Sequence, residues 1–134
     1  MWERSKQVRL RIGILVFAFV FSVGLCIFSN VYVENSMSAI IQKAEEMEKM
    51  LIKHDSKSAS AASESLKEYM VKKSRILESL VPHEDLHDLS VQIEDIVLTI
   101  RIQDLDDCQK ALALIKENAD HLIRHEAFSC GNIF

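Results

Sequence analysis

A long apolar run lies near the start of the chain. Four segments follow it in which apolar residues recur at helical spacing. The run covers residues 12–33 and contains no charged residue. A helix rises about 1.5 Å per residue, so residues 12–33 extend over roughly 33 Å. This length crosses the hydrocarbon core of a bilayer. We therefore predict a transmembrane anchor over residues 12–33.

The charges on either side of the run predict its orientation. Four cations precede it, at Arg4, Lys6, Arg9 and Arg11, together with one acid, Glu3. Arg and Lys accumulate on the cytoplasmic side of a membrane span. We therefore expect residues 1–11 to be a cytoplasmic basic segment and residues 34–134 to lie outside the cytoplasm, attached to the cell membrane by a single pass.

Cleaved signal peptides also begin with basic residues, and they are the alternative interpretation of this segment. Ser22 and Gly24 are small enough to belong to a cleavage site. The apolar region of a signal peptide usually has about 7–15 residues, however, and the run here is longer. The length favours an anchor that is not cleaved.

The four segments behind the run have the three- and four-residue spacing of amphipathic helices. Their apolar faces comprise Met37, Ile40, Ile41, Ala44, Met47 and Leu51; Ala59, Ala62, Leu66, Tyr69, Lys73, Ile76 and Leu80; Leu86, Leu89, Ile93, Ile96 and Ile100; and Cys108, Ala111, Leu112, Ile115, Ala119 and Leu122. Nothing between Glu34 and Met37 forces a break, so the first segment can continue the membrane span. Turns are expected at residues 54–56, at Pro82 and near residues 103–104.

The predicted fold is all-α. Each segment is apolar on one face only, so no segment forms a stable helix alone. The chain has three Gly and one Pro, too few turn-forming residues for a sandwich or a barrel. We predict an N-terminal transmembrane helix followed by a three- or four-helix antiparallel bundle over residues 34–134.

The bundle is acidic, which narrows the choice of partners. Residues 34–134 hold 12 of the 16 Lys and Arg and 19 of the 20 Asp and Glu, a net charge of −7 with His neutral. Such a surface repels phosphate backbones, so no nucleic acid partner is expected. The expected partners are the bilayer, through residues 12–33, and a protein, either a multi-span membrane protein or a second copy of this chain.

His83, Glu84 and His87 match the H-E-x-x-H pattern of zinc peptidases, in which two imidazoles bind zinc and the Glu activates water. Here the pattern opens a helix directly after the proline, no strand is available for a substrate, and Glu84 falls opposite the apolar face. His121 and His125 form a second pair one helical turn apart. We interpret both pairs as exposed side chains and expect no enzyme activity and no cofactor. A metal-binding enzyme or sensor that uses the two pairs is the alternative, and a small ligand-sensing bundle is a third possibility.

Three cysteines occur, at positions 26, 108 and 130. Cys26 falls within the apolar run, and Cys108 falls on an apolar face, where a buried thiol is expected. A helix over residues 105–126 places Cys108 roughly 27 Å from its end, whereas four further residues reach back only about 14 Å. We therefore do not expect Cys108 and Cys130 to pair, and Cys130 is the candidate for an intermolecular disulfide in an oxidising compartment.

The layout resembles a family of small bacterial membrane-anchored proteins, domain of unknown function 4363. The resemblance rests on the basic start, the single span, Pro82-His83-Glu84-Asp85-Leu86 opening a helix, and the terminal Asn132-Ile133-Phe134. It is best over residues 68–134, and His83, but not His87, matches the His of the family. The family has no established activity, and the resemblance implies an accessory role beside other membrane proteins. We predict interaction surfaces at Ile133, at Phe134 and around His83.

Overall fold

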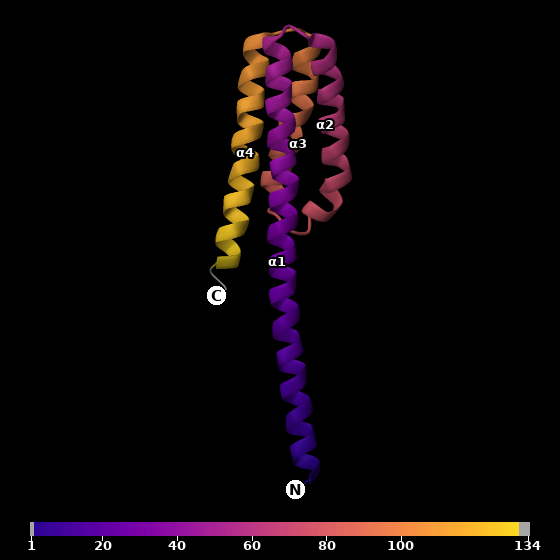
Figure 1. The fold of residues 1–134 in the computed structure, drawn as a ribbon, viewed down its shortest axis with the longest axis vertical. Helices are drawn as coiled ribbons and strands as arrows, with labels where there is room; N and C mark the ends of the chain where they lie inside the picture. Colours follow the sequence, from indigo (N-terminus) through magenta and orange to yellow (C-terminus); the bar gives the residue numbers. More distant parts are fainter. Residues whose placement is uncertain (1, 132–134) are drawn as a thin grey trace.

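Four helices make up the part of the chain that the computed structural model describes, which is the backbone of residues 2–131 and their side chains except at 128–130. They are α1 (Trp2–Ile52), α2 (Ser56–Leu77), α3 (His83–Arg101) and α4 (Leu105–Gly131), and residues 2–131 contain no strand. Figure 1 shows that α1 extends far beyond the other three helices, which pack beside its C-terminal half. The predicted all-α fold, a long apolar helix followed by a helical bundle, is confirmed.

The bundle has four helices because the second half of α1 is one of them. Its neighbouring pairs are α1 with α2, α2 with α3, α3 with α4, and α4 with α1. Residues 53–55, 78–82 and 102–104 form the connections. Connections this short place consecutive helices side by side and antiparallel. The chain therefore runs up and down around a single core.

The turns at residues 53–55 and 102–104, at the end of the bundle far from residue 2, have the same local structure. His54 and Gln103 adopt the left-handed conformation, with φ of 56° and 58°, and each ends the preceding helix. Asp55 then accepts a hydrogen bond from the backbone N–H of Ser58 at 3.1 Å. In the second turn Asp104 accepts one from the N–H of Asp107, also at 3.1 Å. These carboxylates satisfy backbone donors that a helix start leaves without a partner.

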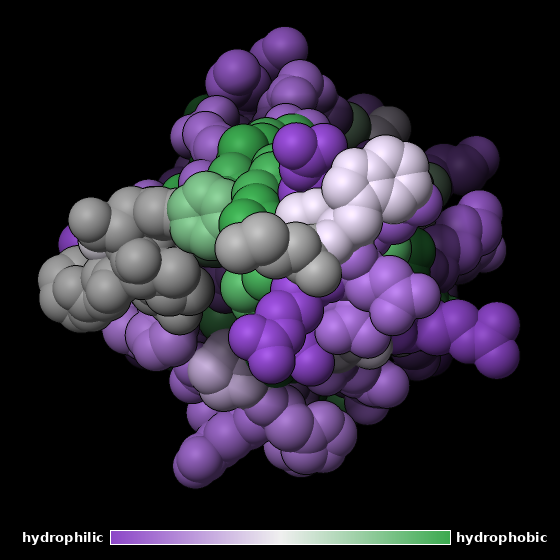
Figure 2. All heavy atoms as spheres, turned by 90° about the horizontal axis from the view of Figure 1, so that it is seen from below, coloured by the Kyte–Doolittle hydropathy of each residue, from purple (hydrophilic) through white to green (hydrophobic). Residues whose placement is uncertain are grey.

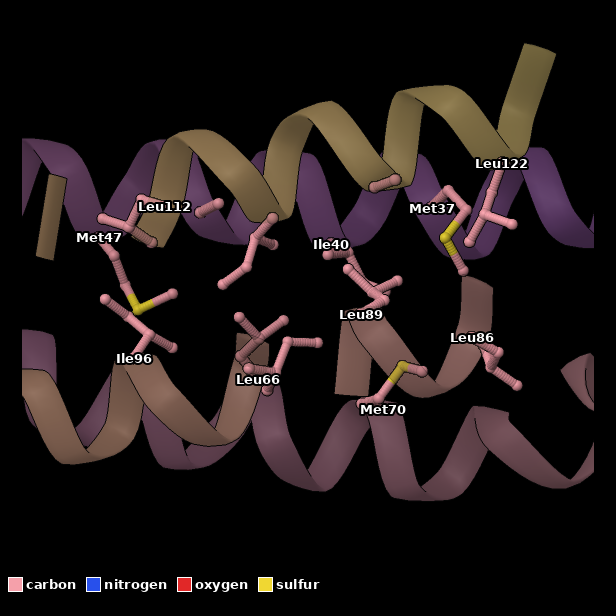
Figure 3. Packing of buried hydrophobic residues seen from close by; sticks show 14 of the residues in the cluster. Met37, Ile40, Met47, Leu66, Met70, Leu86, Leu89, Ile96, Leu112 and Leu122 are labelled. Carbon is pink, nitrogen blue, oxygen red and sulfur yellow. The ribbon is translucent and has the colours of Figure 1, made fainter. Parts of the chain in front are cut away.

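One continuous apolar core joins all four helices (Figure 3). In the close-up, Met37 of α1 lies near Leu122 of α4, and Met47 lies near Leu112. The apolar faces predicted for residues 37–51, 86–100 and 108–122 are confirmed, with Ile41 and Ala111 only partly buried. Burying one such large side chain contributes about 1.5–3 kcal/mol, so the core dominates the stability of the bundle.

The predicted face of the second segment is wrong in its C-terminal half. The structure buries Ala59, Ser63, Leu66, Met70 and Leu77, whereas Ile76 is 43% exposed. The spacing favoured the face beside the buried one because Ser63, which lies on the buried face, is polar. The hydroxyl of Ser63 donates to the carbonyl of Ser60 at 2.7 Å, so this side chain can be buried. The helix also ends at Leu77, five residues before the turn predicted at Pro82. The N–H of Val81 then donates to the carbonyl of Leu77 and closes a further turn.

α1 passes without a break from the uncovered apolar run into the bundle. The first buried residue along the helix is Ser29, and in residues 12–28 only Val23 and Cys26 are even half-buried. Residues 29–33 of the predicted anchor therefore already pack against the bundle. Within residues 2–131, α1 is the one helix that is long and apolar enough to cross a membrane, a property that signal sequences share.

Candidate functional site

The foot of the bundle, where α1 leaves it, is held by a contact between α1 and α4. The hydroxyl of Ser29 donates a hydrogen bond to the Glu126 carboxylate, with 2.6 Å between Oγ and Oε1. Ser29 is only 9% exposed. A hydrogen bond to a charged group is stronger than a neutral one and more costly to break when it is part-buried. It fixes the last part of α4 beside the start of the covered part of α1.

Aromatic rings and lysines gather near the same foot. Phe28 and Tyr32 stack with 5.8 Å between ring centroids. Lys73 Nζ lies 5.2 Å from the centroid of Tyr32 and 5.6 Å from that of Tyr69, and Lys43 Nζ lies 5.5 Å from that of Tyr69. Tyrosine and lysine at the end of an apolar helix are typical of the boundary between a membrane and water. In Figure 2, hydrophilic side chains surround the apolar helix at this end of the molecule.

The histidines of the H-E-x-x-H pattern lie at the first turn of α3. His83, Glu84 and His87 are all exposed, and the two imidazoles stack with their centroids 6.4 Å apart and their planes at 21°. Glu84 is exposed on the surface of α3. The three side chains of this pattern therefore face solvent.

The second histidine pair lies on α4 and is not combined with the first. His121 and His125 are exposed, with ring centroids 6.3 Å apart. A small depression between α3 and α4 is lined by His121 together with Asp85, Asp88 and Asn118. Among the side chains that the structure describes, which exclude those of residues 128–130, no three of His, Cys, Asp or Glu are grouped closely enough to hold a metal ion.

Two of the predicted interaction residues, Ile133 and Phe134, lie outside the described residues, and so does the side chain of Cys130. The third interaction residue, His83, is exposed at the foot-facing start of α3. Of the three predicted interaction residues, His83 is thus the one whose accessibility the structure describes.

Apolar side chains that the sequence did not single out are exposed at the end of the bundle opposite the foot. We call them the distal apolar end; they are Ile52, Leu98, Ile102 and Leu105, and they are between 40% and 75% exposed. They flank the two turns that join α1 to α2 and α3 to α4 (Figure 1). Ile102 directly precedes the left-handed Gln103, and Ile52 lies two residues before the left-handed His54.

The buried thiol predicted at Cys108 is confirmed. Its burial raises its pKa, and the carboxylates of Asp104 and Asp107 act in the same direction. A raised pKa leaves little thiolate near neutral pH, and the thiolate is the reactive form. Cys108 is therefore a core residue.

A family model described as Domain of unknown function (DUF4363) matches residues 27–133, which is nearly the whole covered part of α1 together with α2, α3 and α4. No curated protein and no solved structure shows a significant match to the chain.

Proposed function

The chain belongs to the family of Domain of unknown function (DUF4363), and we propose that it is a single-pass membrane-anchored accessory protein. Its bundle stands outside the cytoplasm and binds another membrane protein. The observation that carries this proposal is the division of α1 into an uncovered apolar half and a half that belongs to the bundle core.

The uncovered half supports the membrane anchor. Phe17, Phe19 and Leu15 are between 64% and 71% exposed, and the residues around them are of the same character. Soluble monomers rarely expose a contiguous apolar surface this large. A bilayer removes it from water without any further protein chain.

The continuity of α1 supports a role in holding the bundle at a fixed position above the membrane. A flexible linker would let the bundle move freely, whereas an unbroken helix passes the orientation of the anchor to the core. The cations before the run favour a cytoplasmic N-terminus, which leaves the bundle outside. The acidic bundle is repelled by anionic lipid, in keeping with a domain that stands away from the surface.

The distal apolar end supports a protein partner. Exposed Ile and Leu at helix ends are available for contact, and apolar side chains with a polar surround are common in the centres of interfaces. A multi-span membrane protein with an extracytoplasmic part is the partner that we propose, with a second copy of this chain as the alternative.

The experiment is photo-crosslinking of the full-length protein in native membranes, followed by mass spectrometry. A photoreactive amino acid is placed at Ile102, in the distal apolar end, and, as a matched control, at the exposed Glu117 in the middle of α4. We expect position 102 to give one discrete crosslinked membrane protein and position 117 to give none. Equal, diffuse crosslinking from both positions would argue against a specific partner at this end.

The alternative function, a metal-binding enzyme or sensor that uses the two histidine pairs, has less support. The pairs lie on separate helices, all four side chains are exposed, and no grouping of three ligands occurs in residues 2–131. Metal analysis of the full-length protein separates the two functions, because stoichiometric zinc or iron lost on substitution of His83 and His87 would favour the metal site.

A further inference from the structure

The antiparallel register of α1 and α4 determines which position of α4 lies opposite Cys26. The contact between Ser29 and Glu126 fixes that register at the foot. Cys26 lies three residues before Ser29 in α1, which is about 4.5 Å along the helix axis. Position 130 lies four residues after Glu126 in α4, which is about 6 Å along the axis. Both steps run in the same direction, so the two cysteines lie at nearly the same height.

The two positions also lie on the facing sides of their helices. Steps of three and four residues keep a side chain on one face of a helix. Cys26 therefore shares the face of the buried Ser29 and Val33, and position 130 shares the face of Glu126 and the buried Leu122. The backbone of α4 is described as far as Gly131, so position 130 is still helical.

Cys26 differs from its neighbours in the apolar run. It is half-buried where most of residues 12–28 are exposed, and its sulfur is disulfide-bonded. Cys108 is a free thiol. It lies 18 residues before Glu126 along α4, which is roughly 27 Å from the foot.

We propose that Cys26 and Cys130 form an intramolecular disulfide that fastens the end of α4 to α1 at the point where the anchor enters the bundle. Axes of packed helices are 8–10 Å apart, and their Cα atoms lie about 2.3 Å from the axis. Facing Cα atoms thus approach to about 3.4–5.4 Å, a range that overlaps the separations of about 4.4–6.8 Å that a disulfide spans. The side chain of Cys130 lies outside the described residues, and the position of the α4 backbone carries this assignment.

The chemistry rests on the proposed location of the bundle outside the cytoplasm, where disulfides form and persist. Two thiols lose two protons and two electrons as the S–S bond forms. The disulfide of an extracytoplasmic thiol oxidoreductase accepts them and becomes a dithiol. The new bond closes a loop of roughly 100 residues, which restricts the unfolded chain strongly. It also prevents α4 from separating from α1 at the foot.

The test counts thiols on the full-length protein taken from membranes, denatured in detergent and treated with a maleimide that adds mass. Without prior reduction we expect one labelled thiol per chain, from Cys108, and after reduction three. The variants Cys26→Ser and Cys130→Ser should each show two thiols without reduction. The matched control, Cys108→Ser, should show none without reduction and two after it.

Two results would overturn the proposal. One is three labelled thiols without reduction. The other is a reducible dimer that persists in Cys26→Ser and is lost in Cys130→Ser, which would establish an intermolecular bridge. An impermeant label on the exposed position 61, introduced as Ala61→Cys, reports the side of the bundle independently. Three free thiols in a protein whose bundle lies outside the cytoplasm would contradict the disulfide but not the proposed function. A bundle that lies inside the cytoplasm would contradict the proposed function.

Discussion

Ser29 and Glu126 are separated by 97 positions in the chain and by 2.6 Å in the structure. Their hydrogen bond joins the point where α1 emerges from the bundle to the last turns of α4. The membrane-facing end of the bundle is thereby held by a polar contact. Higher up, the interface between α1 and α4 is mainly apolar and includes one ion pair, with 2.6 Å between Lys116 Nζ and Glu48 Oε1.

Ser29→Ala is expected to lower the free energy of unfolding by about 1–3 kcal/mol, because it leaves a part-buried carboxylate without its donor. Urea unfolding of the full-length protein in mild detergent, followed by circular dichroism, measures the change. Glu126→Gln keeps an acceptor at the same place and should cost less than Ser29→Ala. If Ser29→Ala unfolds at the same urea concentration as the original protein, the bond makes no contribution to stability.

Two leucines on α4 provide a matched test of the core. Leu112 is fully buried and Leu114 is 48% exposed, although they are two residues apart on the same helix. Leu112→Ala should lower the free energy of unfolding by about 2–5 kcal/mol because it leaves a cavity, and Leu114→Ala should change it by less than about 0.5 kcal/mol. The same unfolding assay compares them, and similar losses at both positions would contradict the register of α4.

The fold followed from the sequence wherever one apolar face was unambiguous. In α3 and α4 the three- and four-residue spacing left a single choice, and the predicted residues are buried except Ala111, which is partly buried. Val97 is buried as well, although the spacing did not include it. In α2 the alanines and serines at positions 59–65 gave two competing faces. Only the packed neighbours select the one that includes Ser63 and Met70. The end of α2 was misjudged because the turn at residues 78–81 keeps helix-like hydrogen bonds.

The cap of α2 predicts a dependence on acid. The hydrogen bonds from Ser58 lower the pKa of Asp55 below its ordinary value of 3.8. The stability that this carboxylate contributes is therefore fully present above pH 3.8, and it is lost as the pH falls through the lower pKa of the folded state.

Asp55→Asn tests this dependence, because asparagine caps a helix but does not titrate in this range. Its melting temperature should fall less steeply than that of the original protein below pH 4, and Asp55→Ala should melt earlier at every pH. Thermal melts at pH 7, 5, 4 and 3 give the comparison. Parallel curves for the original protein and Asp55→Asn would show that the ionised carboxylate does not matter.

The double variant His83→Ala/His87→Ala tests the zinc interpretation of the H-E-x-x-H pattern. Both side chains are exposed and stack only on each other, so their removal should change the free energy of unfolding by less than about 0.5 kcal/mol. The melting temperature should also be indifferent to added zinc in both proteins. If zinc raises the melting temperature of the original protein but not that of the double variant, the result would support a zinc site at these two histidines.

The candidate surfaces were predicted less completely than the fold. The histidine pairs were visible in the sequence as spacing, and their exposure follows from their place beside the apolar faces. Ser29 was hidden because it is one uncharged residue in an apolar run, although it continues the spacing of Val33 and Met37. Its partner Glu126 could not be found from spacing, since the contact depends on how α4 packs against α1. The distal apolar end was missed because apolar residues beside turns are indistinguishable in sequence from core residues.

The central claim is that the uncovered half of α1 spans a membrane and leaves the bundle outside the cytoplasm. It is tested most directly by labelling intact cells with a membrane-impermeant maleimide. One variant carries Ser5→Cys, before the apolar run, and the other carries Ala61→Cys, on the exposed side of α2. The unsubstituted protein gives the background. We predict labelling at position 61 in intact cells and labelling at position 5 only after the cells are opened. Labelling at position 5 alone in intact cells, or at neither position until the cells are opened, would contradict the account.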